Sequence, residues 1–276
     1  MATRIILVAG QVKAADLTGH HDYAAGCALL AHLLEQTAGV AAEVVRDGWP
    51  ADENLFAGAR AVVFYTAGGG RQPFLQMPER WERLRVLAGD GVGLVLLHQA
   101  VDFPADHVAT AAAWFGGATE RRVSKRGHWM ARHADFPSHP VTRGVTPFKA
   151  RDGWLCEARF AADAGTVTPL LWARTARRAA DVVAWAYERP GGGRSFCFSG
   201  LDAHRAWAPA GLRQLIVNGV LWSAGLEIPA AGAPCSADAH ALTADLTPRA
   251  SLASIAAALL GKSFRRITGY RERPAR

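Results

Sequence analysis

The stretch GVGLVLLHQA, residues 91–100, is the part of the sequence that most constrains the fold. Its run from Val92 to Leu97 is continuously apolar, which is typical of a strand buried on both faces in the middle of a parallel sheet. The run ends abruptly in the polar pair His98-Gln99. Open α/β sheets bind ligands beyond the carboxyl ends of such strands, so this pair marks a candidate site.

Strands and helices alternate through the first hundred residues. Apolar strands are predicted over residues 4–10, 41–45 and 60–66, and helices over 23–37 and 78–88. Connections of this length predict an α/β fold with a doubly wound, mainly parallel sheet and helices on both faces. Later in the chain, residues 181–187 and 194–199 flank a Pro-Gly-Gly-Gly turn, which predicts a hairpin.

The composition changes after Pro229 to Ala, Gly, Ser and Pro. This change predicts an α/β domain over residues 1–229 and a C-terminal extension over 230–276, with one helix at 251–260 and a basic end. We expect a chain shortened to about residue 230 to fold, unless the apolar side of that helix packs on the core.

The positive charge is concentrated in the extension. Residues 248–276 contain seven Lys or Arg and one acid, and so carry six of the seven net positive charges. The rest of the chain is nearly neutral, so the high isoelectric point says little about the ligand of the main domain. Few aromatic residues accompany the basic end, and no recognised module precedes it, so nucleic-acid binding is not expected.

The four cysteines, Cys27, Cys156, Cys197 and Cys235, form no CxxC motif. The N-terminal apolar run from Ile5 to Ala9 is too short for a signal peptide. No apolar run approaches the ~20 residues that span a bilayer. We therefore expect four reduced thiols in a cytoplasmic protein that does not enter a membrane.

Further polar and glycine-rich motifs follow other predicted strands: Gly68–Gly70, His20-His21-Asp22 and Asp202-Ala203-His204. Because the carboxyl ends of parallel strands meet at one edge, we expect these motifs to share a crevice with His98. The backbone N–H groups of Gly69 and Gly70 could approach a ligand closely. The glycines match neither a P-loop nor a dinucleotide fingerprint, which excludes nucleotide binding by either motif.

Seven segments, in order, resemble the ThuA-like (trehalose utilisation) family over roughly residues 3–229: GHHDYAAGCALLAHLL, TAGGG, GVGLVLLHQA, WFGGAT, HPVTRGV, DGWLCE and GGGRSFCFSGLDAHRAW with the helix that follows it. The resemblance implies a class I glutamine amidotransferase-like fold with a flavodoxin-like sheet. It also implies a role in disaccharide metabolism, notably through keto-sugar derivatives.

The chain departs from the amidotransferase pattern at the turn after its central strand. That pattern needs a cysteine there, and this chain has His98. An imidazole cannot form the thioester through which glutamine releases ammonia, so we expect no glutaminase activity. The family also often carries an acidic residue where this chain has Gly153.

These residues together favour an enzyme of hydrolase or lyase type that acts on a sugar or keto-sugar by acid/base chemistry. His98 and His204 are the predicted acid/base pair, because imidazoles exchange protons near neutral pH. His21 and Asp22 are expected to orient them or the sugar. The residues predicted to contact the sugar are Gly69, Gly70, Gln99, Asp202 and Arg205, with Trp207 stacking on its ring.

Two alternatives stay open. In the first, His21, His98 and His204 hold a divalent metal such as zinc, since three imidazoles and an open position make a catalytic zinc site. In the second, the protein is a non-catalytic sugar-binding or scaffold domain of the same fold. The sugar, the bond acted on and the oligomeric state also stay open, and a homo-oligomer is one alternative.

Overall fold

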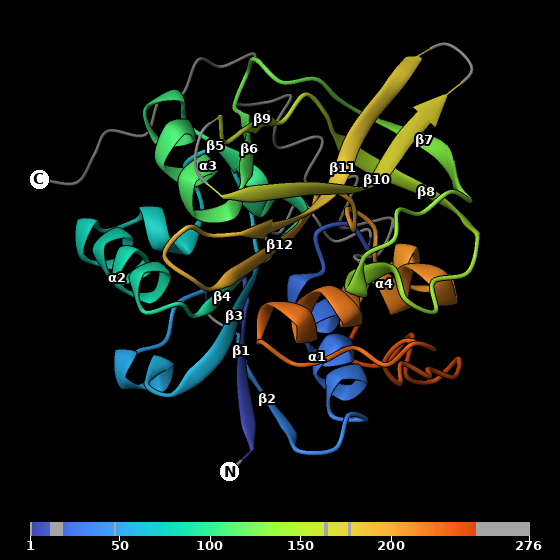
Figure 1. Ribbon diagram of the computed structural model, residues 1–276, viewed down its shortest axis with the longest axis horizontal. Coiled ribbons are helices and arrows are strands. Elements are labelled where there is room, and N and C mark those ends of the chain that lie inside the picture. Colours follow the sequence, from blue (N-terminus) through green and yellow to red (C-terminus); the bar gives the residue numbers. More distant parts are fainter. Residues whose placement is uncertain (1, 12–18, 47, 163–164, 176–177, 247–276) are drawn as a thin grey trace, which may run out of the picture.

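The computed structural model in Figure 1 describes residues 2–11, 19–46, 48–162, 165–175 and 178–246. The helix predicted over residues 251–260 and the basic end lie outside the described residues.

The central sheet has seven strands, and five neighbouring strands of it are parallel. The parallel strands are β2 (Val40–Val45), β1 (Thr3–Ala9), β3 (Ala59–Tyr65), β4 (Gly93–Leu97) and β12 (Arg194–Phe198), in spatial order. This order is that of a flavodoxin-like sheet, so the predicted fold class is confirmed. The predicted hairpin is also present: it joins β11 (Arg178–Glu188) to β12, and β10 (Thr166–Thr175) pairs antiparallel with β11 at the edge of the sheet.

Helices cover both faces of the sheet (Figure 1). Helices α1 (Tyr23–Leu34) and α4 (Ala210–Ser223) pack on one face, and α2 (Pro78–Gly89) and α3 (Val108–Phe115) on the other. In β4, Val95 and Leu97 face the first pair, while Leu94 and Leu96 face the second. Every residue of β4 is buried, as the apolar run predicts for a central strand. In the described part of the chain, no helix is long and apolar enough to cross a bilayer.

A second antiparallel pair, β7 (Arg126–His133) and β8 (Phe148–Leu155), lies beside the β10–β11 hairpin (Figure 1). A small third sheet contains β5 (Asp102–Phe103), β6 (Gly117–Glu120) and β9 (Arg159–Phe160). Glu157 lies between β8 and β9 and adopts a left-handed backbone with φ 59°, which separates the two strands. Short 3₁₀ helices are η2 (Glu53–Phe56), η3 (Pro73–Leu75), η4 (His98–Val101), η5 (Ala105–His107), η6 (Pro140–Thr142) and η7 (His204–Trp207).

The four cysteines are free thiols. Cys27, Cys156 and Cys197 are buried, and burial raises the pKa of the Cys27 and Cys197 thiols above the ordinary range. The Cys197 thiol donates to the Phe115 carbonyl inside the core. Thiols of this kind are suited to packing rather than to nucleophilic chemistry.

The first part of the predicted extension packs on the α/β domain. Ala233 is buried, and Cys235 and Leu242 pack against the core on the side of α1 and α4. The Leu242 carbonyl oxygen lies 3.1 Å from His204 Nε2, and the Gln36 side chain bonds the backbone of Ser236 in both directions. Residues 230–246 thus contact the α/β domain closely, which changes the expectation for a shortened chain.

A chain ending at residue 229 should be less stable than one ending at residue 246. The difference should be about 2–4 kcal/mol, because truncation uncovers apolar surface and leaves the buried His204 ring without its carbonyl partner. Urea unfolding of the two chains measures the difference. Equal midpoints would show that residues 230–246 do not support the fold.

Candidate active site

Loops from three parallel strands meet at the carboxyl edge of the sheet, as the sequence predicts. His98 directly follows β4, and Asp202 lies in the loop after β12. Residues 19–22, on the path from β1 to α1, reach the same loop. His20 forms a β-bridge with Ala203, and the His21 N–H donates to the Asp202 carbonyl at 2.8 Å. The backbone thus brings the side chains of these loops to one place.

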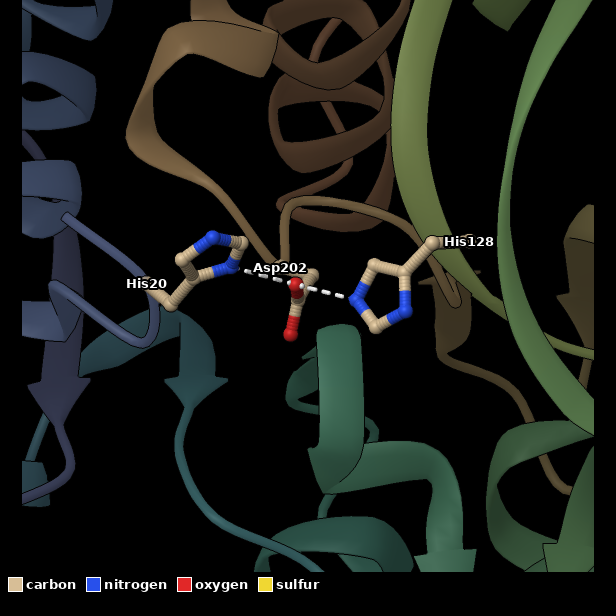
Figure 2. Close-up of side chains that lie close together, drawn as sticks. All are labelled: His20, His128 and Asp202. Atoms are coloured by element: carbon tan, nitrogen blue, oxygen red, sulfur yellow. Dashed lines mark hydrogen bonds and ion pairs between the residues drawn. The ribbon is translucent and has the colours of Figure 1, made fainter. Parts of the chain in front are cut away.

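Four imidazoles surround the carboxylate of Asp202. Its Oδ2 atom lies 2.7 Å from His20 Nδ1 and 2.8 Å from His128 Nε2 (Figure 2). Its Oδ1 atom lies 3.0 Å from His21 Nε2 and 3.2 Å from His98 Nε2. We call these five side chains the Asp202 cluster.

The side chains of the Asp202 cluster differ in their exposure to solvent. The side chain of His98 is 2% exposed and that of Asp202 is 7% exposed, whereas that of His128 is 60% exposed. Burial by itself would raise the pKa of Asp202, but the imidazoles of His21, His98 and His128 outweigh burial and hold that pKa well below its ordinary value. Asp202 is therefore an anion held among imidazoles, with His128 as the ring most open to solvent.

His98 is held in an unusual backbone conformation. Its φ is 57°, in the left-handed region that residues other than glycine seldom adopt. A sharp turn directly after a central strand is where enzymes with a nucleophile elbow place their nucleophile. Gly68, in the loop after β3, leaves space for this turn, since a Cβ at Gly68 would lie 1.9 Å from the Gln99 carbonyl oxygen. The turn therefore presents an imidazole at a position suited to chemistry.

Asp152, in β8, holds the loop that carries Asp202. Its carboxylate accepts from the backbone N–H groups of Leu201 at 2.5 Å, Asp202 at 2.9 Å and Ala203 at 3.3 Å. Asp152 is 1% exposed, and burial raises its pKa while the charge of His98 and the backbone N–H groups act in the other direction. Asp152 thus positions Asp202 through the backbone without joining the cluster.

Gly153 leaves the space in which Asp202 meets His128. A Cβ at this position would lie 2.8 Å from Asp202 Cβ and 2.9 Å from His128 Nε2. A side chain of any size here would displace the contact between these two residues. The contact between Asp202 and His128 therefore depends on a glycine at position 153.

Gly153→Ala is expected to lower any activity of the Asp202 cluster by about 10²-fold and stability by about 1–3 kcal/mol, because the methyl group overlaps a packed contact. Turnover and thermal unfolding measure the two effects. Gly191→Ala is the matched control, since a Cβ there meets nothing within 4 Å. Equal behaviour of the two variants would contradict the packing role of Gly153.

A cavity of about 260 Å³ opens beside the cluster, lined by His98, Gln99, Arg126, Gly127, His128, Gly153, Trp154, Leu155 and Asp202. Its walls combine the turn after β4 with the β7–β8 pair. Arg126 faces the cavity while both terminal nitrogens bond the buried carboxylate of Asp102, at 3.2 and 3.3 Å. The cavity therefore offers a cation, an amide and two imidazoles to a ligand.

Two residues predicted for the site lie elsewhere. His204 Nε2 bonds the Leu242 carbonyl oxygen, so the ring does not join the Asp202 cluster and does not pair with His98. Burial lowers the pKa of His204, while the bond to Leu242 and the charge of Asp22 oppose that shift. Trp207 is fully buried beside Gly26 of α1, so its ring has no face open for a sugar.

The predicted glycine cradle is already used within the protein. The Gly69 N–H donates to the Asp102 carbonyl at 2.5 Å, and the Gly70 N–H donates to Gln72 Oε1 at 2.9 Å. Neither N–H is left for a ligand. Asp22 is buried at the start of α1, and the exposed Arg205 does not line the cavity. Of the predicted sugar contacts, Gln99 and Asp202 line the cavity.

Sequence reasoning missed His128 and the positioning role of Asp152. His128 lies in a strand pair that the sequence marks only weakly, and nothing in its neighbourhood distinguishes it from a surface histidine. In the motif His20-His21-Asp22, the sequence predicts roles for His21 and Asp22 and none for His20. The DGWLCE segment was a better signal, because an Asp-Gly pair buried in a strand is unusual.

The fold and the site define a flavodoxin-like α/β protein with a histidine–carboxylate centre at the carboxyl edge of its sheet. The chain belongs to the ThuA family, whose model, described as trehalose utilisation, matches residues 7–223. No match was found among curated protein sequences.

Two solved structures of proteins described as ThuA-like have a similar fold. A ThuA-like protein from Parabacteroides merdae superposes with a TM-score of 0.60 at 13% identity, covering 86% of this chain and 98% of that chain. A ThuA-like protein from Bacteroides uniformis has a TM-score of 0.57 at 12% identity, covering 80% and 90%. At these identities the likeness concerns the fold.

Proposed function

We propose that this protein is an enzyme of carbohydrate metabolism that converts a sugar or keto-sugar by acid/base chemistry at the Asp202 cluster, without a cysteine nucleophile. The observation that carries the proposal is the convergence of four imidazoles on one carboxylate beside a cavity. Binding a sugar needs hydroxyl partners, whereas moving its protons needs groups that exchange them near neutral pH. The family description, trehalose utilisation, supports the substrate class.

The cavity suggests how the work is divided. His128 is the exposed imidazole and lines the cavity, so it is the group that exchanges a proton with a sugar hydroxyl. Arg126 and Gln99 donate hydrogen bonds to sugar oxygens. At about 260 Å³ the cavity is slightly smaller than the usual range of ligand sites, about 300–1,000 Å³, which favours one sugar unit as the reacting group.

The absence of a thiol at the cavity supports the non-covalent route. Among the described residues that line it, none is a cysteine, and the turn after β4 carries His98 instead. Neither glutaminase nor peptidase chemistry of the superfamily's thiol type can run at this turn without a thiolate.

His98→Ala and His98→Asn test the proposal together. Because both variants remove the buried imidazole that faces Asp202 and so disturb the geometry in which His128 acts, each is expected to lower turnover of a disaccharide or its keto derivative by about 10²-fold. Chromatography of the products measures turnover, and calorimetry measures sugar binding. His32→Ala is the control, since His32 is exposed on α1 away from the cavity.

A sugar-binding module would behave differently. The wild-type protein would bind the sugar without forming product, and His98→Asn would retain most of the affinity that His98→Ala loses. Unchanged turnover and binding in both variants would remove His98 from the site.

A further inference from the structure

The two oxygens of the Asp202 carboxylate have different surroundings. Oδ2 forms hydrogen bonds with His20 Nδ1 and His128 Nε2, which approach it from opposite sides (Figure 2). The His20 and His128 rings each have a hydrogen-bond partner in Oδ2. Oδ1 faces His21 and His98 instead.

The contact of His98 with Oδ1 is not an ordinary hydrogen bond. His98 Nε2 lies 3.2 Å from Oδ1 but forms no hydrogen bond with it, and neither ring nitrogen of His98 has a hydrogen-bond partner among the described residues. The ring is 2% exposed, so water does not readily replace such a partner. A buried imidazole left in this state costs free energy that a ligand at this point would recover.

The orientation of the Gln99 side-chain amide indicates whether His21 Nε2 donates or accepts a hydrogen bond. Arg71 donates to Gln99 Oε1 at 3.3 Å, and since a guanidinium only donates, the amide nitrogen of Gln99 must be the atom 3.1 Å from His21 Nε2. His21 Nε2 therefore accepts this hydrogen bond and carries a lone pair instead of a proton, which is the form in which an imidazole binds a metal. A bound metal would take the place of the Gln99 donor at that lone pair. His21 Nε2 and Asp202 Oδ1 lie 3.0 Å apart, a separation at which both atoms can bind the same cation.

We propose that His21 Nε2, His98 Nε2 and Asp202 Oδ1 bind one divalent transition metal, such as zinc. The three side chains offer ligand atoms within 4.8 Å of one another. With bonds of about 2.1 Å, ligand atoms lie about 3.0 Å apart in octahedral and about 3.4 Å apart in tetrahedral coordination. The N–O separations of 3.0 and 3.2 Å lie within this range. Two imidazoles and one carboxylate leave coordination positions open.

This ligand set differs from the one that the sequence suggests, since Asp202 takes the place of His204. His20 and His128 hold the other carboxylate oxygen and so orient the ligand, as outer-shell partners do in metal sites. Two of the three ligands, His98 and Asp202, line the cavity, which places the open positions next to it. Only the metal's use, polarising a sugar oxygen, rests on the proposed function; binding does not.

The test uses the full chain freed of metal by chelation and dialysis. Zn²⁺ binding is measured by calorimetry, and Co²⁺ binding by its visible absorption bands, which report the coordination geometry. We expect one ion per chain. His21→Gln and His98→Gln should weaken Zn²⁺ binding by at least about 10²-fold and remove the Co²⁺ bands, because each loses a ligand. His21, 21% exposed, covers the case in which His98→Gln disturbs the fold, which circular dichroism would reveal.

Two further variants make the test specific. His20→Gln removes an outer-shell bond and should retain stoichiometric binding with at most about 10–100-fold weaker affinity and the Co²⁺ bands present. His204→Gln should bind as the wild type does, because an amide can still donate to the Leu242 carbonyl. The proposal is overturned if the wild type takes up no Zn²⁺ or Co²⁺ at millimolar concentration. It is also overturned if His20→Gln loses the bands while His21→Gln keeps them.

The two proposals fail separately. Tight metal binding without conversion of any sugar would leave the metal site standing and remove the proposed function. Conversion by chelated, metal-free protein at the full rate would leave the function standing and remove the metal's role in it.

Discussion

Asp202→Asn is expected to lower turnover by at least about 10³-fold, the largest effect on activity in this protein. The asparagine amide has one oxygen in place of two, so either the His20–His128 pair or the His21–His98 pair faces an NH₂ group where the carboxylate offers an oxygen. It also removes the negative charge that the four imidazoles surround. A loss of 10³-fold corresponds to about 4 kcal/mol of transition-state stabilisation, and steady-state kinetics measure it.

Asp106→Asn is the matched control for Asp202. Asp106 is an exposed carboxylate with a single imidazole partner, His107, at 2.8 Å. Exposed pairs of this kind contribute little, so that variant should keep the wild-type rate. Comparable losses in both variants, or wild-type turnover in Asp202→Asn, would show that the reaction takes place elsewhere.

Among single substitutions, Asp152→Asn is expected to cause the largest loss of stability, at about 3 kcal/mol. Asp152 Oδ1 accepts from Gly153, Asp202 and Ala203, and Oδ2 accepts from Leu201. In asparagine one of these atoms becomes a donor and faces a backbone N–H inside the protein, where an unmade bond costs about 1–3 kcal/mol and the lost charge adds to it. Thermal or urea unfolding measures the loss.

Asp52→Asn gives the comparison for Asp152. Asp52 is exposed and accepts one backbone N–H, from Asn54, at 2.9 Å. Its replacement should cost under about 1 kcal/mol, because asparagine keeps a capping oxygen and water satisfies the rest. If Asp152→Asn unfolds at the same midpoint as Asp52→Asn, the loop that carries Asp202 does not depend on Asp152.

Local patterns predicted most of the α/β core. The apolar run of β4 has no solvent-facing positions, so only the centre of a sheet with helices on both faces can bury it. The hairpin of β11 and β12 followed from its glycine turn. The split between β8 and β9 did not follow, because it depends on a left-handed residue, Glu157, that no local signal marks.

The candidate site could be predicted in part. Parallel strands bring their carboxyl ends to one edge, so His21, His98 and Asp202 were expected together and lie together. His204 was expected with them and bonds Leu242 instead, since the direction of a side chain beyond a strand end depends on the turn that follows. Trp207, three residues further on, faces the core for the same reason.

The sequence by itself determined the strands, the helices and the edge at which polar side chains gather. The period of apolar residues that marks each strand and helix depends only on neighbours along the chain. Only the tertiary structure decided which of those side chains meet. His128, Asp152 and Gly153 come from the β7–β8 pair, 49 to 74 residues from Asp202 in sequence, and their contacts with the Asp202 loop depend on how that pair packs over the sheet edge. Packing between distant segments produces no pattern in the sequence of either segment. A histidine on a strand therefore cannot be distinguished from a surface residue until the position of that strand in the fold is known.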